Sequence, residues 1–195
     1  MVNASNRICI TQTTLSCHLS RKKSIPELSA IVGDSIKQCE HHQAKNIHFV
    51  THSLGGILVR AYFNQHAAHP LVKRIVMLGA PNHGSEVVDK YKDSWWFKWL
   101  TGPAGQQLGT DAKSLVHDLK PLTFEVGIIA GSSSSDPWFA TLFQGENDGK
   151  VSVESTKLSE MKDFIQVDNG HTFMSNSRSV IKQISAFLAT GSFVH

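Results

Sequence analysis

The stretch IHFVTHSLGG, residues 47–56, decides the fold of this 195-residue chain. Its first five residues are mostly apolar, as expected for a strand that is covered on both faces of a parallel sheet. Ser53 follows at a sharp turn, and the residues from Leu54 to about His66 are predicted to form a helix. The two glycines at the start of that helix lower its propensity by up to about 1 kcal/mol each relative to alanine. That cost fits a place where the backbone must pass close to other backbone.

A serine at the apex of a strand–turn–helix unit is placed for chemistry. The turn holds the hydroxyl above the carboxyl end of the sheet, beside the free N–H groups of the helix start. The Ser53 hydroxyl can then attack a carbonyl carbon, while the start of the helix stabilises the oxyanion that forms. Ser53 could instead be a simple helix cap, because serine is a favoured N-cap residue. A cap needs neither the preceding histidine nor the following glycine pair, so the pattern favours a nucleophile.

Strands and helices alternate along the rest of the chain. A helix is expected from Ser24 to about residue 43, with Ser24 and Glu27 forming a capping box at its start. Further strands are expected at 72–78, 124–130 and 163–167, and an apolar stripe predicts a final helix that ends at Gly191. This order predicts an α/β fold with a mostly parallel sheet and helices on both faces, in one domain spanning residues 1–195.

Composition excludes several classes of function. The net charge is only +3 and the longest basic run is residues 21–23, which argues against a nucleic-acid binder. No apolar stretch approaches the roughly 20 residues that span a bilayer, so we expect no stable membrane insertion. The histidine clusters 41–42 and 66/69 lack the spacing of a metal site, and we expect neither metal nor other cofactor.

Three cysteines, Cys9, Cys17 and Cys39, cannot all pair, and none lies in a CxxC arrangement. We interpret them as reduced thiols. The first twenty residues lack the apolar core of a secretory signal. Both observations favour a cytoplasmic location.

Two further loops carry the partners that a serine nucleophile needs. A serine hydroxyl attacks readily only when an imidazole takes its proton, and a carboxylate then orients that imidazole. Asp148 lies in a polar loop after the strand at 124–130, and His171 lies in the loop after the last strand. The order Ser53, Asp148, His171 is the order expected of a hydrolase with this type of sheet. The alternatives to these assignments are Asp136 or Asp168 as the acid, His83 as the base, an ordinary turn at Asp148-Gly149 and a solvent-exposed His171.

With these segments in view, the chain resembles the α/β-hydrolase superfamily, in particular its bacterial lipases and esterases. The likeness rests on residues 51–56, 80–85, 147–151 and 170–173, and spans roughly 24–187. It implies a carboxylic-ester hydrolase of small-molecule or lipid esters that works through an acyl-enzyme. Ser53 would be the nucleophile, Asp148 the acid, His171 the base and the Leu54 N–H an oxyanion donor. A thioesterase or acyltransferase with the same triad, and a non-catalytic hydrolase-like binding protein, are the alternatives.

The chain departs from the family pattern in two places. Thr51 stands where the family usually has glycine, which predicts a tighter turn. No His-Gly pair precedes Ser53, although the second oxyanion donor of this fold comes from an earlier loop. We therefore expect a fold reduced at its amino terminus, without the usual first strand, helix and oxyanion loop. The strand edge left open would be covered by a homo-oligomer or by residues 1–20.

An aromatic segment lies between the second and third of these strands. Trp95, Trp96 and Trp99 fall within residues 87–120, which we expect to be irregular or helical. In lipase-like hydrolases an insertion here forms a lid or cap that presents apolar surface to acyl chains, so these tryptophans are candidate substrate-binding residues. A core-packing helix is the alternative.

Overall fold

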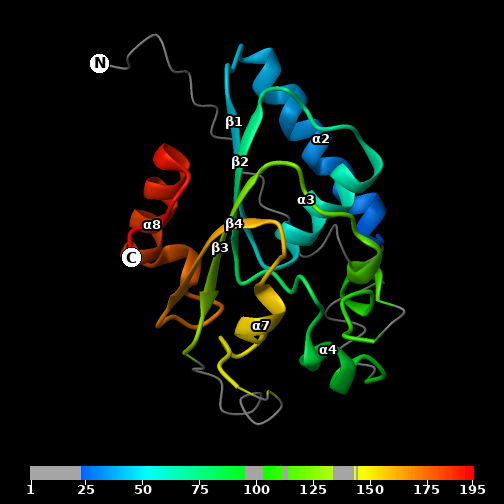
Figure 1. The fold of residues 1–195 in the computed structure, drawn as a ribbon. Helices are drawn as coiled ribbons and strands as arrows, with labels where there is room; N and C mark the ends of the chain where they lie inside the picture. The colour runs from blue at the N-terminus through cyan, green and yellow to red at the C-terminus, as the bar shows by residue number, and fades with distance from the viewer. Residues whose placement is uncertain (1–22, 95–102, 112–113, 134–142, 144) are drawn as a thin grey trace.

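Four parallel strands form the sheet of this protein (Figure 1). The structure, a computed structural model, describes residues 23–94, 103–111, 114–133, 143 and 145–195. The strands pair in chain order, β1-β2-β3-β4. Their bounds are β1 Ile47–His52, β2 Val72–Leu78, β3 Glu125–Gly131 and β4 Met161–Val167. All four predicted strands are confirmed, although β4 begins two residues before the predicted start.

Three long helices accompany the sheet, and each was predicted. They are α2 Ile25–His41, α3 Leu54–Gln65 and α8 Arg178–Thr190. Shorter helical pieces include α4 Glu86–Tyr91, α7 Val153–Thr156 and the 3-10 turns η1 Leu115–Asp118 and η2 Met174–Asn176. The helical pieces α4 and η1 fall in or next to the segment 87–120, where irregular or helical structure was expected.

The sheet is covered by helices on both faces, as predicted. Successive strand residues point to opposite faces, and β2 shows the division clearly. Ile75 and Met77 belong to the core cluster that α2 and α3 cover, whereas Val76 and Leu78 pack with the residues of α8. Figure 1 accordingly shows α8 on one side of the sheet and α2 with α3 on the other. The fold class, an α/β fold with a parallel sheet, is therefore confirmed.

Local signals fix the helix ends. At the start of α2, the Glu27 carboxylate accepts hydrogen bonds from the backbone N–H and the hydroxyl of Ser24, both at 2.7 Å, within the expected capping box. At the end of α8, Gly191 takes the left-handed conformation with φ 82°. The atom closest to a Cβ at Gly191 would be Lys162 Nζ, the end of a flexible side chain, at 2.7 Å, so it is the left-handed conformation that favours glycine there.

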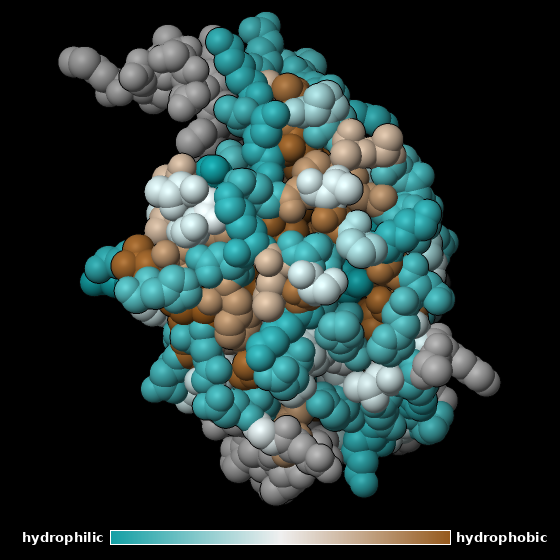
Figure 2. Space-filling model, in the orientation of Figure 1, coloured by the Kyte–Doolittle hydropathy of each residue, from teal (hydrophilic) through white to brown (hydrophobic). Residues whose placement is uncertain are grey.

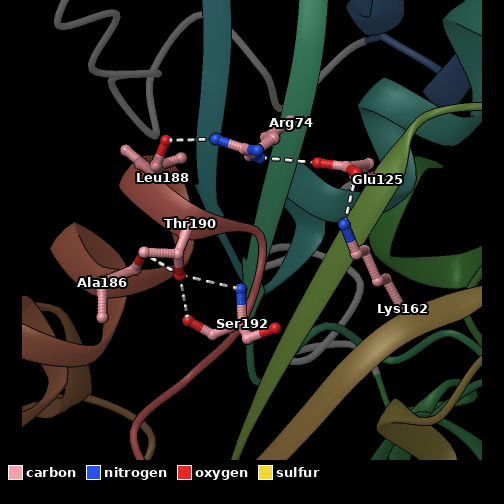
Figure 3. A network of polar contacts seen from close by, with 7 residues as sticks. All are labelled: Arg74, Glu125, Lys162, Ala186, Leu188, Thr190 and Ser192. Carbon is pink, nitrogen blue, oxygen red and sulfur yellow. Dashed lines mark hydrogen bonds and ion pairs between the residues drawn. The ribbon is translucent and has the colours of Figure 1, made fainter.

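A charged network holds the end of α8 to the sheet (Figure 3). Arg74 of β2 donates to the Leu188 carbonyl at 2.7 Å and to the Glu125 carboxylate of β3 at 2.6 Å. Lys162 of β4 binds the other oxygen of the same carboxylate. Both cations lower the pKa of Glu125, with the Lys162 contact contributing most. One carboxylate thus connects three neighbouring strands, and its arginine partner reaches the last turn of α8.

Strand β1 lies at one edge of the described sheet, as expected. Its Val50 is 46% exposed, although the neighbouring Val76 of β2 is fully buried. On the face of the molecule seen in Figure 2, hydrophobic areas lie between hydrophilic residues. The expected covering of this edge by residues 1–20 lies outside the described residues, as do Cys9 and Cys17. Cys39 is buried and is not in a disulfide.

In the part of the chain that the structure describes, no helix is long and apolar enough to cross a membrane. The same residues contain no group of three or more histidine, cysteine, aspartate or glutamate side chains that could hold a metal ion.

Candidate active site

Ser53 occupies a strained turn between β1 and α3. Its backbone angles are φ 53° and ψ −125°, a region that residues with a side chain rarely adopt, at a cost of about 1–3 kcal/mol. The Ser53 N–H donates to the Leu78 carbonyl at the end of β2, at 2.9 Å. Strain of this kind is typical of a turn that exposes a nucleophilic serine at the top of a sheet.

Space explains the second of the two glycines after Ser53. A Cβ at Gly56 would lie 2.7 Å from the Cβ of Ala80, closer than real side chains approach. A Cβ at Gly55 would lie 3.4 Å from the Cβ of Thr51. A contact of that length is ordinary, so space alone does not require glycine at Gly55. The close approach is therefore present at Gly56 alone, and it is to the side chain of Ala80 rather than to backbone as expected.

Asp148 and His171 form a buried pair. Oδ2 of Asp148 lies 2.7 Å from Nδ1 of His171, and their side chains are 1% and 5% exposed. The other carboxylate oxygen, Oδ1, accepts from the backbone N–H groups of Lys150 at 3.0 Å and Val151 at 2.8 Å. A buried carboxylate needs such donors to remain charged. This arrangement fixes the proton of a neutral His171 on Nδ1 and leaves the lone pair on Nε2.

Glycines at the ends of β2 and β3 make room for this pair. Gly79 has φ 52°, and a Cβ there would lie 2.8 Å from Oδ2 of Asp148 and 3.2 Å from Nδ1 of His171. A Cβ at Gly131 would lie 2.8 Å from the Asp148 Cβ and 2.3 Å from the Asn169 carbonyl oxygen. The loops that carry Asp148 and His171 therefore pack closely against the ends of β2 and β3, where Gly79 and Gly131 leave room for them.

The Ser53 turn and the His171 ring are connected through His52. The rings of His52 and His171 have centroids 4.7 Å apart, and Nε2 of His52 lies 2.9 Å from the His171 carbonyl oxygen. Within the described residues, neither Oγ of Ser53 nor Nε2 of His171 makes a hydrogen bond. Leu54 is the first residue of α3, so its N–H has no acceptor inside the helix.

The other candidates stand apart from this pair or lie outside the described residues. Asp168 is exposed. His83 donates its backbone N–H to Ser155, and its ring lies 6.4 Å from that of His117. Outside the described residues are Asp136, Trp95, Trp96 and Trp99. The roles of Ser53, Asp148, His171 and Leu54 in catalysis, and of the tryptophans in binding, stay predictions.

Sequence reasoning missed a buried arginine that holds the loop after β2. Arg60 of α3 is 4% exposed, and its guanidinium donates to the Asn82 carbonyl at 2.8 Å and to the Val116 carbonyl at 3.3 Å. The side-chain amide of Asn82 donates in turn to the Thr156 carbonyl at 2.7 Å. The loop at 80–85 is thus held against α3 and α7. A buried arginine that binds carbonyl groups gives no signal in a hydrophobic pattern.

Comparison with known proteins agrees with this architecture. The mature form of the lipase BlEst2 from Bacillus licheniformis has a TM-score of 0.69 and 20% identity, over 89% of this chain and 76% of its own. The metagenomic carboxyl esterase MGS0156 has a TM-score of 0.61 and 16% identity, over 79% of this chain and 52% of its own. YbtT, the type II thioesterase of the yersiniabactin pathway, has a TM-score of 0.56 and 14% identity, over 89% and 77%.

At these identities the likeness shows the fold alone. No curated protein sequence matches the chain. The family model of the alpha/beta hydrolase fold matches residues 21–178, a span that contains Ser53, Asp148 and His171. The chain therefore belongs to the α/β-hydrolase fold family.

Proposed function

We propose that this protein hydrolyses carboxylic esters through an acyl-enzyme formed on Ser53. The observation that carries the proposal is the buried Asp148–His171 pair, joined at 2.7 Å. Nε2 of His171 has no hydrogen-bond partner among the described residues. The ring of His52, the residue before Ser53, lies against the same imidazole. A histidine that is held at Nδ1 by a carboxylate and free at Nε2 is suited to act as a general base.

The proposed reaction uses these groups in order. His171 Nε2 accepts the proton of Ser53 Oγ as the oxygen attacks the ester carbonyl, and the Leu54 N–H donates to the developing oxyanion. His171 then gives the proton to the leaving alcohol, which leaves the acyl group on Ser53. A water molecule activated by the same imidazole releases the acid. Asp148 stabilises the charged form of His171 throughout and keeps its ring oriented.

Covalent labelling tests whether Ser53 is activated. We expect a fluorophosphonate to label the wild-type protein and not Ser53→Ala. Ser177→Ala is the matched control, because Ser177 is also a helix N-cap, at the start of α8, and its loss should leave labelling unchanged. Equal labelling of wild type and Ser53→Ala would refute the nucleophile. Absence of labelling in the wild type would favour a non-catalytic binding protein.

A substrate series tests the reaction class. Nitrophenyl esters of increasing acyl length and the matching acyl-thioesters are offered to wild type and Ser53→Ala. We expect ester hydrolysis that depends on Ser53. Faster turnover of thioesters, or acyl transfer to an added alcohol, would move the assignment to a thioesterase or an acyltransferase with the same nucleophile. Hydrolysis at a comparable rate by Ser53→Ala would refute the proposed mechanism.

A further inference from the structure

The His171 main chain is held on both sides by hydrogen bonds. Its backbone N–H donates to the Asp148 carbonyl at 2.9 Å, and its own carbonyl lies 2.9 Å from Nε2 of His52. A carbonyl oxygen only accepts hydrogen bonds, so Nε2 of His52 must carry the hydrogen. With Nδ1 bound to Asp148, the N–H, the C=O and one ring nitrogen of His171 all have fixed partners. Only Nε2, the nitrogen that the proposed reaction uses, has no hydrogen-bond partner among the described residues.

The contact with His52 links distant parts of the sheet. His52 is the last residue of β1 and His171 lies in the loop after β4, so the two come from opposite edges of the described sheet. Strand neighbours are about 4.8 Å apart, which places β1 and β4 roughly 14 Å from each other. The loop after β4 must therefore reach back across the strand ends, and the His52 side chain is positioned to fix it where it arrives beside Ser53.

We infer that His52 is a positioning residue for hydrolysis, which holds the His171 main chain so that Nε2 stays directed at Ser53. The inference rests on the proposed function. His52 transfers no proton and forms no bond in the proposed mechanism, because its Nε2–H is used by the His171 carbonyl. A displacement of about 1 Å in a catalytic group can lower a rate by roughly 100-fold. Loss of the hydrogen bond from His52 should therefore lower kcat by a measurable amount.

The surroundings of His52 favour a neutral ring. Burial lowers the pKa of His52, and the neighbouring His171 lowers it further. The hydrogen bond to the His171 carbonyl and the charge of Asp148 oppose this change, and Lys150 adds to it. A second positive charge is thereby kept away from His171, whose ring must become positive during the reaction.

Two amide variants separate hydrogen bonding from simple packing. The side-chain N–H₂ of His52→Gln reaches about as far as Nε2 of histidine, whereas that of His52→Asn ends short of it. His52→Phe keeps a ring without a donor. His48→Phe is the matched control, because His48 lies on the same strand and the same sheet face but makes no contact with His171.

The kinetic readout is kcat and KM for a nitrophenyl ester. We expect His52→Phe and His52→Asn to lower kcat about 10- to 100-fold with little change in KM. His52→Gln should recover most of the loss, and His48→Phe should leave kcat unchanged. Wild-type kcat in folded His52→Asn or His52→Phe, or equal losses in the Gln and Asn variants, would overturn the inference.

A second readout needs no activity. Nitrogen NMR of protein labelled at histidine reports whether His171 Nδ1 keeps its proton and its bond to Asp148 in each variant. We expect that bond to weaken in His52→Asn and to be retained in His52→Gln. If the wild type hydrolyses nothing and this pattern still appears, the proposed function fails while the positioning role stands. An unchanged His171 signal in every variant overturns the positioning role, whatever the activity.

Discussion

Replacing Ser53 by glycine should stabilise the protein while removing its proposed nucleophile. The φ of 53° and ψ of −125° at Ser53 cost a residue with a side chain about 1–3 kcal/mol, and glycine adopts them freely. Glycine also gives the unfolded chain more conformational entropy, which lowers the free energy of unfolding by roughly 0.4–1 kcal/mol. The free energy of unfolding should therefore rise by about 0.5–2 kcal/mol relative to Ser53→Ala.

The alanine variant is the proper reference, because it lacks the hydroxyl but keeps the strain. For a protein of this size the expected gain corresponds to a Tm about 1–8 °C higher for Ser53→Gly than for Ser53→Ala, measured by thermal unfolding. Ser177 supplies the control, since its φ of −72° and ψ of 128° are ordinary and glycine should give no gain over alanine there. A Ser53→Gly protein no more stable than Ser53→Ala would refute the strained turn.

Three further predictions follow from the same site. Asp148→Asn should lower kcat/KM for a nitrophenyl ester by about 10⁴, and an unchanged value would exclude Asp148 as the residue that orients His171. Gly79→Ala should lower the free energy of unfolding by more than Gly145→Ala in urea titrations, because both have positive φ but only the Cβ added at residue 79 would lie 2.8 Å from a carboxylate oxygen; equal losses would mean that the carboxylate moves aside freely. Burial, and then the charge of Arg74, lower the pKa of His48 below 6.5, so the unfolded state binds more protons and stability should fall as pH drops below 6.5. His48→Phe should reduce this fall between pH 7.5 and 5.5, and an identical fall in both proteins would contradict the assignment.

Local sequence patterns predicted a strand or helix well where its own residues mark both of its ends. Strand β2 begins and ends at the predicted residues because an apolar run is bounded on both sides by loop residues. The start of β4 was missed because Met161 and Lys162 precede its apolar run, and Lys162 is placed there by an ion pair with Glu125 on the neighbouring strand. A contact across the sheet therefore extends a strand that its own sequence leaves undefined.

The Asp148–His171 contact was predictable for a different reason. Loops that leave the carboxyl ends of parallel strands gather at one edge of the sheet, so the order of polar loops along the chain predicts which side chains meet. The rule does not say how a loop bends. The bond from His52 to the His171 carbonyl depends on the course of the loop across the sheet, and the crowding at Gly79 depends on where Asp148 lies. Both therefore required the structure.

Departures from ordinary local geometry point to the candidate site independently of any family. Among the described residues other than glycine, only Gln43 and Ser53 have positive φ. Gln43 follows the end of α2, where a left-handed residue is common, so its conformation needs no functional reason. Ser53 lies in the first β-α connection of the described sheet. The next residues of this site are the buried Asp148–His171 pair and Gly79, which also has positive φ. Strain that persists in a folded protein must be held by its surroundings, and natural proteins concentrate such departures where they have a function. The carboxyl ends of β1 and β2 meet this condition, and the amino ends of the same strands do not.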